Sequence, residues 1–198
     1  GRQCNRGMEG FTGTRDGQFF YGIMQSPLLQ DSTRQKASDK PTGLNCRLPA
    51  FDAAGQFCRE LVYALDDEGN KLNEILHVDD DRFLVIERDG KAGGKARFKK
   101  LMMISTADAS DVADIENLPP TELPPGVQPV RKRVLIDLLD PRWNLGGDAM
   151  PEKIESLAFG PTLPSGDRLL IVVSDNDFES ASPTVIYAFA VPESALPF

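Results

Sequence analysis

Short strand-forming runs, each closed by Gly, Pro, Asp or Asn, constrain the fold of this chain more than any other feature. Runs such as FFYGIMQ (19–25), RFLVIERD (82–89), RVLIDLL (133–139) and RLLIVVSD (168–175) are rich in β-branched and aromatic residues, which favour β-strands. Apolar residues at helical spacing are scarce by comparison. The sequence therefore predicts a single all-β domain over residues 1–198.

Three internal units repeat one pattern, in which a Glu is followed by alternating apolar residues, a polar turn, an apolar strand and a polar or acidic end. The three glutamates are Glu9, Glu74 and Glu155, and the units span residues 8–70, 71–150 and 151–198. Each unit holds about four strands, and four-stranded sheets repeated around an axis form a β-propeller. We therefore predict a partial β-propeller of about three blades. A β-sandwich is the alternative.

So few blades leave a propeller ring open, because closed rings have about 4–8 blades. The first and last sheets of such a piece would expose apolar faces and unpaired strand edges. We therefore expect a missing N-terminal half or a second chain to complete the ring. The position of Gly1, eight residues before Glu9, supports this expectation. Produced alone, the chain should aggregate, dimerise or fold poorly.

The charge balance argues against nucleic acid as a partner, since the net charge is −8 and phosphate backbones attract basic surfaces. The basic run at residues 131–133 fits a solvated strand face better than a nucleic-acid patch. No apolar run approaches the ~18 residues of a membrane-spanning helix, so we expect no membrane partner. The excess of acids is compatible with divalent cations.

The cysteines favour an oxidising compartment. Cys46 and Cys58 flank two short runs around a turn at residues 52–55, and a turn between two strands brings them together. We therefore predict a Cys46–Cys58 disulfide, with Cys4 either free or bonded to polypeptide outside this chain. A disulfide implies a secreted, periplasmic or lumenal protein.

Five sequence blocks are fairly specific as a combination. They are NRGMEGFT (5–12), QSPL (25–28), FLVIERDG (83–90), KIESLAFG (153–160) and VVSDNDF (172–178). In this combination the chain resembles the phytase-like family, described by the phrase "esterase-like activity of phytase". The resemblance covers nearly the whole chain and implies a β-propeller that hydrolyses phosphoesters or esters. Because family members are typically much longer, it also implies that this chain is a C-terminal half.

Equivalent positions in the three units would bring Glu9, Glu74 and Glu155 to the mouth of the propeller channel. Carboxylates gathered there suit Ca²⁺, which would hold a phosphate and polarise a water for attack on it. The predicted metal ligands are Glu9, Glu74, Glu87, Glu155, Asp175 and Asp177. The predicted catalytic residues are Glu9, Glu155 and Arg88, and the predicted phosphate-binding residues are Arg6 and Lys132, since cations bind phosphate oxygens.

A structural interpretation of the same residues is the alternative. A Glu at a strand start accepts N–H bonds, the Asp and Asn of SDND (174–177) form Asx-turns, and residues 87–89 form an ion-pair network. The corresponding function is a non-catalytic ligand- or protein-binding module, or a storage or structural protein. A serine hydrolase is disfavoured, because His77 is the sole histidine and no G-x-S-x-G motif occurs.

Overall fold

The computed structural model describes residues 1–33, 42–180 and 182–198, which form three antiparallel sheets. The first sheet contains β1 (Met8–Gly13), β2 (Phe19–Met24), β3 (Asn45–Asp52) and β4 (Phe57–Ala64). The second contains β5 (Lys71–Asp79), β6 (Arg82–Arg88), β7 (Lys99–Ser105) and β8 (Arg131–Asp137). The third contains β9 (Lys153–Thr162), β10 (Arg168–Asp175) and β11 (Ile186–Val191). The described helical turns are η1 (Leu29–Asp31), η2 (Gly93–Lys95), η3 (Pro141–Trp143) and η4 (Glu193–Ala195), all of them 3₁₀ turns. The all-β prediction is confirmed.

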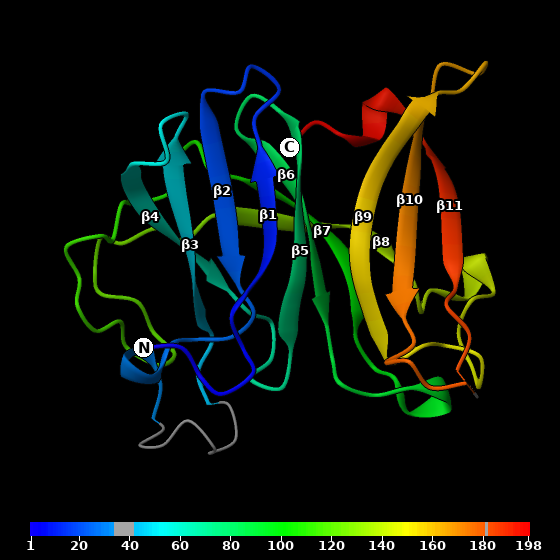
Figure 1. The fold of residues 1–198 in the computed structure, drawn as a ribbon, viewed down its shortest axis with the longest axis horizontal. Coiled ribbons are helices and arrows are strands. Elements are labelled where there is room, and N and C mark those ends of the chain that lie inside the picture. The colour runs from blue at the N-terminus through cyan, green and yellow to red at the C-terminus, as the bar shows by residue number, and fades with distance from the viewer. Residues whose placement is uncertain (34–41, 181) are drawn as a thin grey trace.

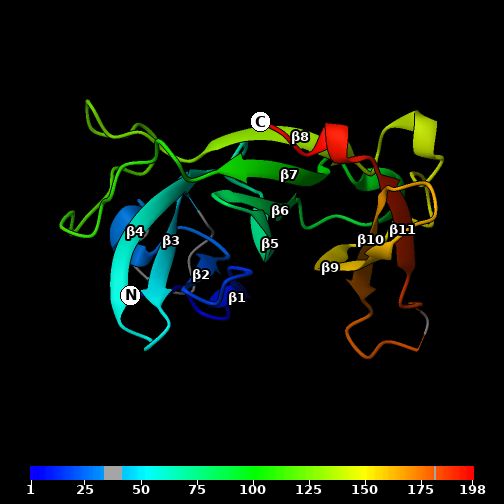
Figure 2. The ribbon, with the colours of Figure 1, turned by 90° about the horizontal axis from the view of Figure 1, so that it is seen from above.

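The sheets pack face to face, with the second sheet between the other two (Figures 1 and 2). Successive side chains of a strand point to opposite faces, and β6 shows the result. Phe83 and Val85 face the core shared with the first sheet, whereas Leu84 and Ile86 face the core shared with the third. The second sheet is therefore buried on both faces, which explains why RFLVIER reads as a nearly continuous apolar run. The described residues form no closed barrel.

The first strands of the three sheets, β1, β5 and β9, lie next to one another and run in the same direction (Figure 1). Gly10 of β1 lies so close to β5 that a Cβ atom there would be 2.5 Å from the Ile75 nitrogen. Further along both strands, the His77 N–H donates to Thr12 Oγ1 at 3.1 Å. These contacts place corresponding ends of the three strands at one end of the molecule, where the candidate site lies.

The predicted Cys46–Cys58 disulfide is wrong, since all three cysteines are free. β3 and β4 form a long antiparallel pair in which Cys46 faces Tyr63, while Cys58 follows Phe57 at the opposite end of the hairpin. Cys46 is buried and Cys58 is exposed. Each cysteine is the second residue of its strand, and antiparallel pairing therefore keeps them apart.

No helix among the residues described in the structure has the length and apolar character needed to cross a membrane.

Candidate functional site

Basic side chains gather where the first strands begin. Lys71 opens β5 and lies directly opposite Arg88, the last residue of β6. Arg6 precedes β1; its charge lowers the pKa of Lys71, and the charge of Arg88 lowers the pKa of Arg6. Lys153, which opens β9, also acts on Lys71. We call Arg6, Lys71 and Arg88 the cationic cluster.

Arg88 connects the second and third sheets within this cluster. Its side chain is 1% exposed, and its Nη2 donates to Glu155 Oε1 at 2.6 Å. Asn73 Nδ2 donates to the same oxygen at 3.1 Å. The Nε atom of Arg88 is buried and has no hydrogen-bond partner in the described structure. A buried guanidinium with an unused donor carries a desolvation cost, and Arg168 Nη1 shows the same feature on the third sheet.

Arg6 and Lys71 are less well paired than Arg88. Arg6 Nη1 donates to Ser26 Oγ at 3.1 Å, and no described carboxylate forms an ion pair with Arg6 or Lys71. Burial lowers the pKa of Lys71, and the charges of Arg6 and Arg88 lower it further. Burial and the charge of Arg88 likewise lower the pKa of Arg6. The cluster therefore carries more positive charge than its neighbours balance.

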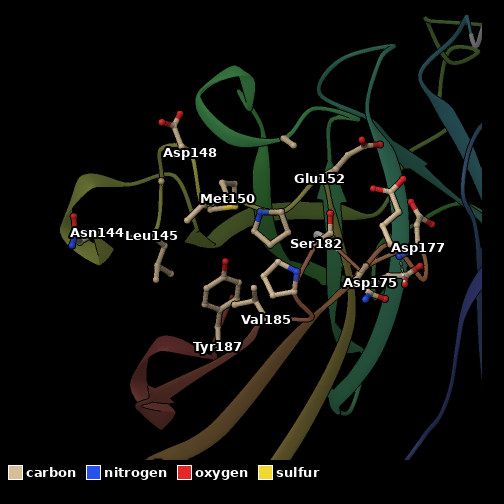
Figure 3. Close-up of a pocket in the computed structure, with 17 residues that line it drawn as sticks. Asn144, Leu145, Asp148, Met150, Glu152, Asp175, Asp177, Ser182, Val185 and Tyr187 are labelled. Carbon is tan, nitrogen blue, oxygen red and sulfur yellow. Dashed lines mark hydrogen bonds between the residues drawn. The ribbon is translucent and has the colours of Figure 1, made fainter.

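A cavity of about 550 Å³ lies beside this end of the third sheet (Figure 3). Carboxylates dominate its charged lining; they are Asp148, Glu152, Asp175, Asp177 and Glu179. Two of them link the cavity to the basic residues, since Asp177 pairs with Lys153 and the charge of Glu152 acts on Lys71. Tyr187 also lines the cavity, and burial raises its pKa. Because these carboxylates repel anions, the cavity suits the polar, uncharged part of a ligand rather than an anionic group.

The cavity and the cluster are held in place by a buried lysine. Lys99 is fully buried on β7, and its Nζ donates to Asp89 Oδ1 at 2.8 Å, to Asp89 O at 2.8 Å and to Glu152 O at 2.7 Å. Asp89 follows Arg88, and Glu152 precedes β9. Lys99 therefore fixes the end of β6 relative to the start of β9, and with it the Arg88–Glu155 contact.

These observations can be compared with known proteins. A family model for the phytase-like domain, described as "Esterase-like activity of phytase", matches residues 1–178. The chain belongs to the phytase-like family. It is also similar to an "Uncharacterized secreted protein" of Arthroderma benhamiae, with 26% identity over 226 residues, covering 90% of this chain and 43% of that protein. This chain thus spans less than half of that relative's length. No solved structure matches.

Glu87 and Lys132, both predicted for the site, lie in a separate hydrogen-bond network away from the cationic cluster. Glu87 is fully buried and accepts bonds from Tyr63 Oη at 2.7 Å, from the Asp66 N–H and Asn70 Nδ2 at 2.8 Å, and from Lys132 Nζ at 3.2 Å. Lys132 also pairs with Asp66 at 2.5 Å. Both charges are therefore satisfied between the first and second sheets, which corresponds to the structural interpretation.

The remaining predicted metal ligands also have partners within the protein. Glu74 accepts from the Ile75 N–H, Glu155 pairs with Arg88, and Asp177 pairs with Lys153. Asp175 Oδ1 accepts the Asp177 N–H in an Asx-turn, and Glu9 is exposed on β1. Among the described residues, no group of three or more His, Cys, Asp or Glu side chains is placed to hold a metal ion. These residues on their own therefore do not fit a Ca²⁺ ion, which requires 6–8 oxygen ligands.

Sequence reasoning missed Lys71, Asn73 and Lys99. Lys71 and Asn73 belong to the strand run that contains Glu74, but only the register of β5 against β6 shows that Lys71 faces Arg88. Lys99 lies at the end of a stretch rich in Lys and Gly, a composition typical of a hairpin loop. The available signal was its position at the start of the strand run KKLMMIS, where a buried lysine requires a carboxylate partner.

Proposed function

We propose that this chain provides the phosphate-binding part of a phosphoester hydrolase of the phytase-like family. The observation that carries the proposal is the cationic cluster, in which Arg6, Lys71 and Arg88 repel one another and Glu155 pairs with Arg88 alone. An anion bound there would relieve the repulsion between the cations. Phosphate fits better than a neutral ester, because arginine donors match its oxygens.

Each residue near the cationic cluster has its own role in the proposed reaction. Arg6 and Arg88 bind and orient the phosphate oxygens, and the Lys71 ammonium balances the second negative charge of a phosphomonoester. Glu155 accepts a proton from a water whose oxygen attacks phosphorus. The P–O ester bond breaks, and the leaving oxygen takes a proton from solvent water, so that an alcohol and inorganic phosphate are released. Arg88 and Asn73 hold one oxygen of Glu155, which leaves the other for the water. A catalytic role for Glu9 remains a prediction, and so does the use of Ca²⁺ as a cofactor.

We further propose that the three sheets are consecutive blades of a β-propeller that additional polypeptide completes. The parallel first strands support this arrangement, and so does the relative of more than twice this length. The name of that relative also supports a secreted protein.

Charge removal in the natural, native-length protein tests the proposed site. Lys71→Met should raise KM for a phosphomonoester such as p-nitrophenyl phosphate about tenfold, which is ~1.4 kcal/mol of binding. The exposed Lys91→Met is the matched control and should leave KM unchanged. Initial rates of hydrolysis with and without a calcium chelator test separately whether the activity requires Ca²⁺. Equal KM values for both variants, or hydrolysis of p-nitrophenyl acetate but no phosphate release, would contradict the proposal.

The second candidate is a non-catalytic module that binds a phosphate ester without hydrolysing it. The acid-lined cavity beside the cationic cluster favours this candidate, because it offers room and polar contacts for the remainder of a ligand. Calorimetric binding of a phosphomonoester that depends on Lys71, together with no release of phosphate, would identify it.

A further inference from the structure

The third sheet has one strand fewer than the other two. The first and second sheets each have four strands in chain order, whereas the third has the order β11-β10-β9. β11 pairs with β10 along one side, and no described strand pairs with its other side. An unpaired strand edge readily accepts another strand.

The hydrogen bonds to β10 show which backbone groups point outward. The Ser174 N–H donates to Val185 O at 2.9 Å, just before β11. In an antiparallel pair, residues that bond to the neighbouring strand alternate with residues that do not. With the observed register, the residues that bond to β10 are Val185, Tyr187, Phe189 and Val191. The N–H and C=O groups of the residues between them point to the free edge; these are Ile186, Ala188 and Ala190.

An apolar cavity of about 500 Å³ follows this edge and is lined by Trp143, Leu145 and residues 186–190. The ring of Trp143 meets that of Phe189 edge-on, with centroids 5.3 Å apart. Trp143 Nε1 is buried and has no hydrogen-bond partner in the described structure. The edge therefore combines free backbone groups, an apolar groove and an unused side-chain donor.

The end of the chain does not fill this edge. After β11, residues 192–198 cross to the second sheet (Figure 1). There Arg133 Nη2 donates to the carbonyl oxygens of Ala195 and Pro197, each at 2.6 Å, and Arg82 Nη1 donates to Leu196 O at 3.2 Å. The segment that could most easily have formed the fourth strand is thus bound elsewhere.

We propose that β11 receives a fourth, antiparallel strand from polypeptide of the same protein outside residues 1–198. Every strand pair described in this chain is antiparallel, and a relative carries more than half of its length outside the matched part. The added strand has apolar side chains at alternate positions to cover Trp143 and Phe189, and one of its carbonyl groups accepts from Trp143 Nε1. Main-chain bonds supply the affinity, as in other strand additions.

Hydrogen exchange measured by NMR on the native-length protein and on its Ala188→Pro variant tests this proposal. In the native-length protein, the outward amides of Ile186, Ala188 and Ala190 should exchange on the order of 100-fold more slowly than exposed, unbonded amides. The amides of Tyr187 and Phe189 are the internal control, because β10 protects them in both proteins. Ala188→Pro, which removes an outward N–H only, should abolish the protection at Ile186 and Ala190.

Unprotected outward amides in the native-length protein would overturn the proposal. Protection that rises with protein concentration, together with a dimer of the native-length protein in sedimentation, would also overturn it, because the occupant would then be a second copy. Neither outcome depends on phosphate binding, so the strand and the proposed function fail separately.

Discussion

Single residues show how this chain handles buried charge. Lys99 donates hydrogen bonds to three oxygens, and Glu87 accepts from four donors. Such fully bonded charges are costly to break and stabilise the fold only modestly on balance. Arg88 is buried to the same degree but keeps one donor unpaired and lies near two further cations. The two nearby cations therefore distinguish Arg88, a candidate ligand-binding residue, from Lys99 and Glu87, whose charges the protein satisfies.

Glu74 should destabilise the protein at neutral pH. Burial raises its pKa above the usual 4.5, although the bond from the Ile75 N–H opposes the shift. The folded state thus holds this proton more tightly than the unfolded state, and stability falls as the pH rises from 4.5 through the folded pKa. We expect Glu74→Gln to raise Tm by a few degrees at pH 7 and not at pH 4, as followed by thermal denaturation. The exposed Glu9→Gln is the control, and a Tm gain of the same size at both pH values would contradict this reasoning.

At the level of elements, the contact between β1 and β5 sets how closely two sheets approach. A side chain at position 10 would meet backbone atoms of Glu74 and Ile75 at 2.5–2.8 Å, and backbone moves less readily than a side-chain tip. The glycine is therefore required by proximity between strands rather than by its own conformation.

Gly10→Ala should lower the free energy of unfolding by about 1–3 kcal/mol, the usual cost of overpacking. Urea denaturation measures this loss. A Cβ atom added at Gly7 would meet no other atom within 4 Å, so Gly7→Ala should change stability little. Equal effects of the two substitutions would show that β1 can move away from β5 without cost.

Elements also show what the sequence could and could not reveal. Strands bounded by turn-forming residues, such as 82–88, can be identified from the sequence because burial on both faces leaves a continuous apolar pattern. The Asx-turn after β10 matches the structural role predicted for SDND. The pairing of Cys46 with Tyr63, and of Lys71 with Arg88, depends on register, which a single sequence does not encode locally. Candidate site residues from one strand were therefore predictable, whereas their cross-strand neighbours were not.

At the scale of the whole molecule, the first and third sheets expose apolar side chains. Phe11 is 55% exposed, Phe57 is 52% exposed and Ile186 is 67% exposed. We expect residues 1–198 alone to self-associate in sedimentation velocity, and Phe11→Ser with Phe57→Thr to reduce the association, because exposed apolar patches drive it. A monodisperse monomer of the unchanged chain would count against an incomplete propeller.

The burial of the second sheet on both faces also affects how the chain folds during synthesis. The first sheet ends at Ala64 and the sheet that covers it ends at Asp137. At about 5–20 residues per second, a ribosome needs several seconds to add the intervening stretch. During that interval the inner face of the first sheet, with Leu48 and Leu61, has emerged without its cover. We therefore expect this apolar face to be prone to wrong contacts in the nascent chain until β8 is made.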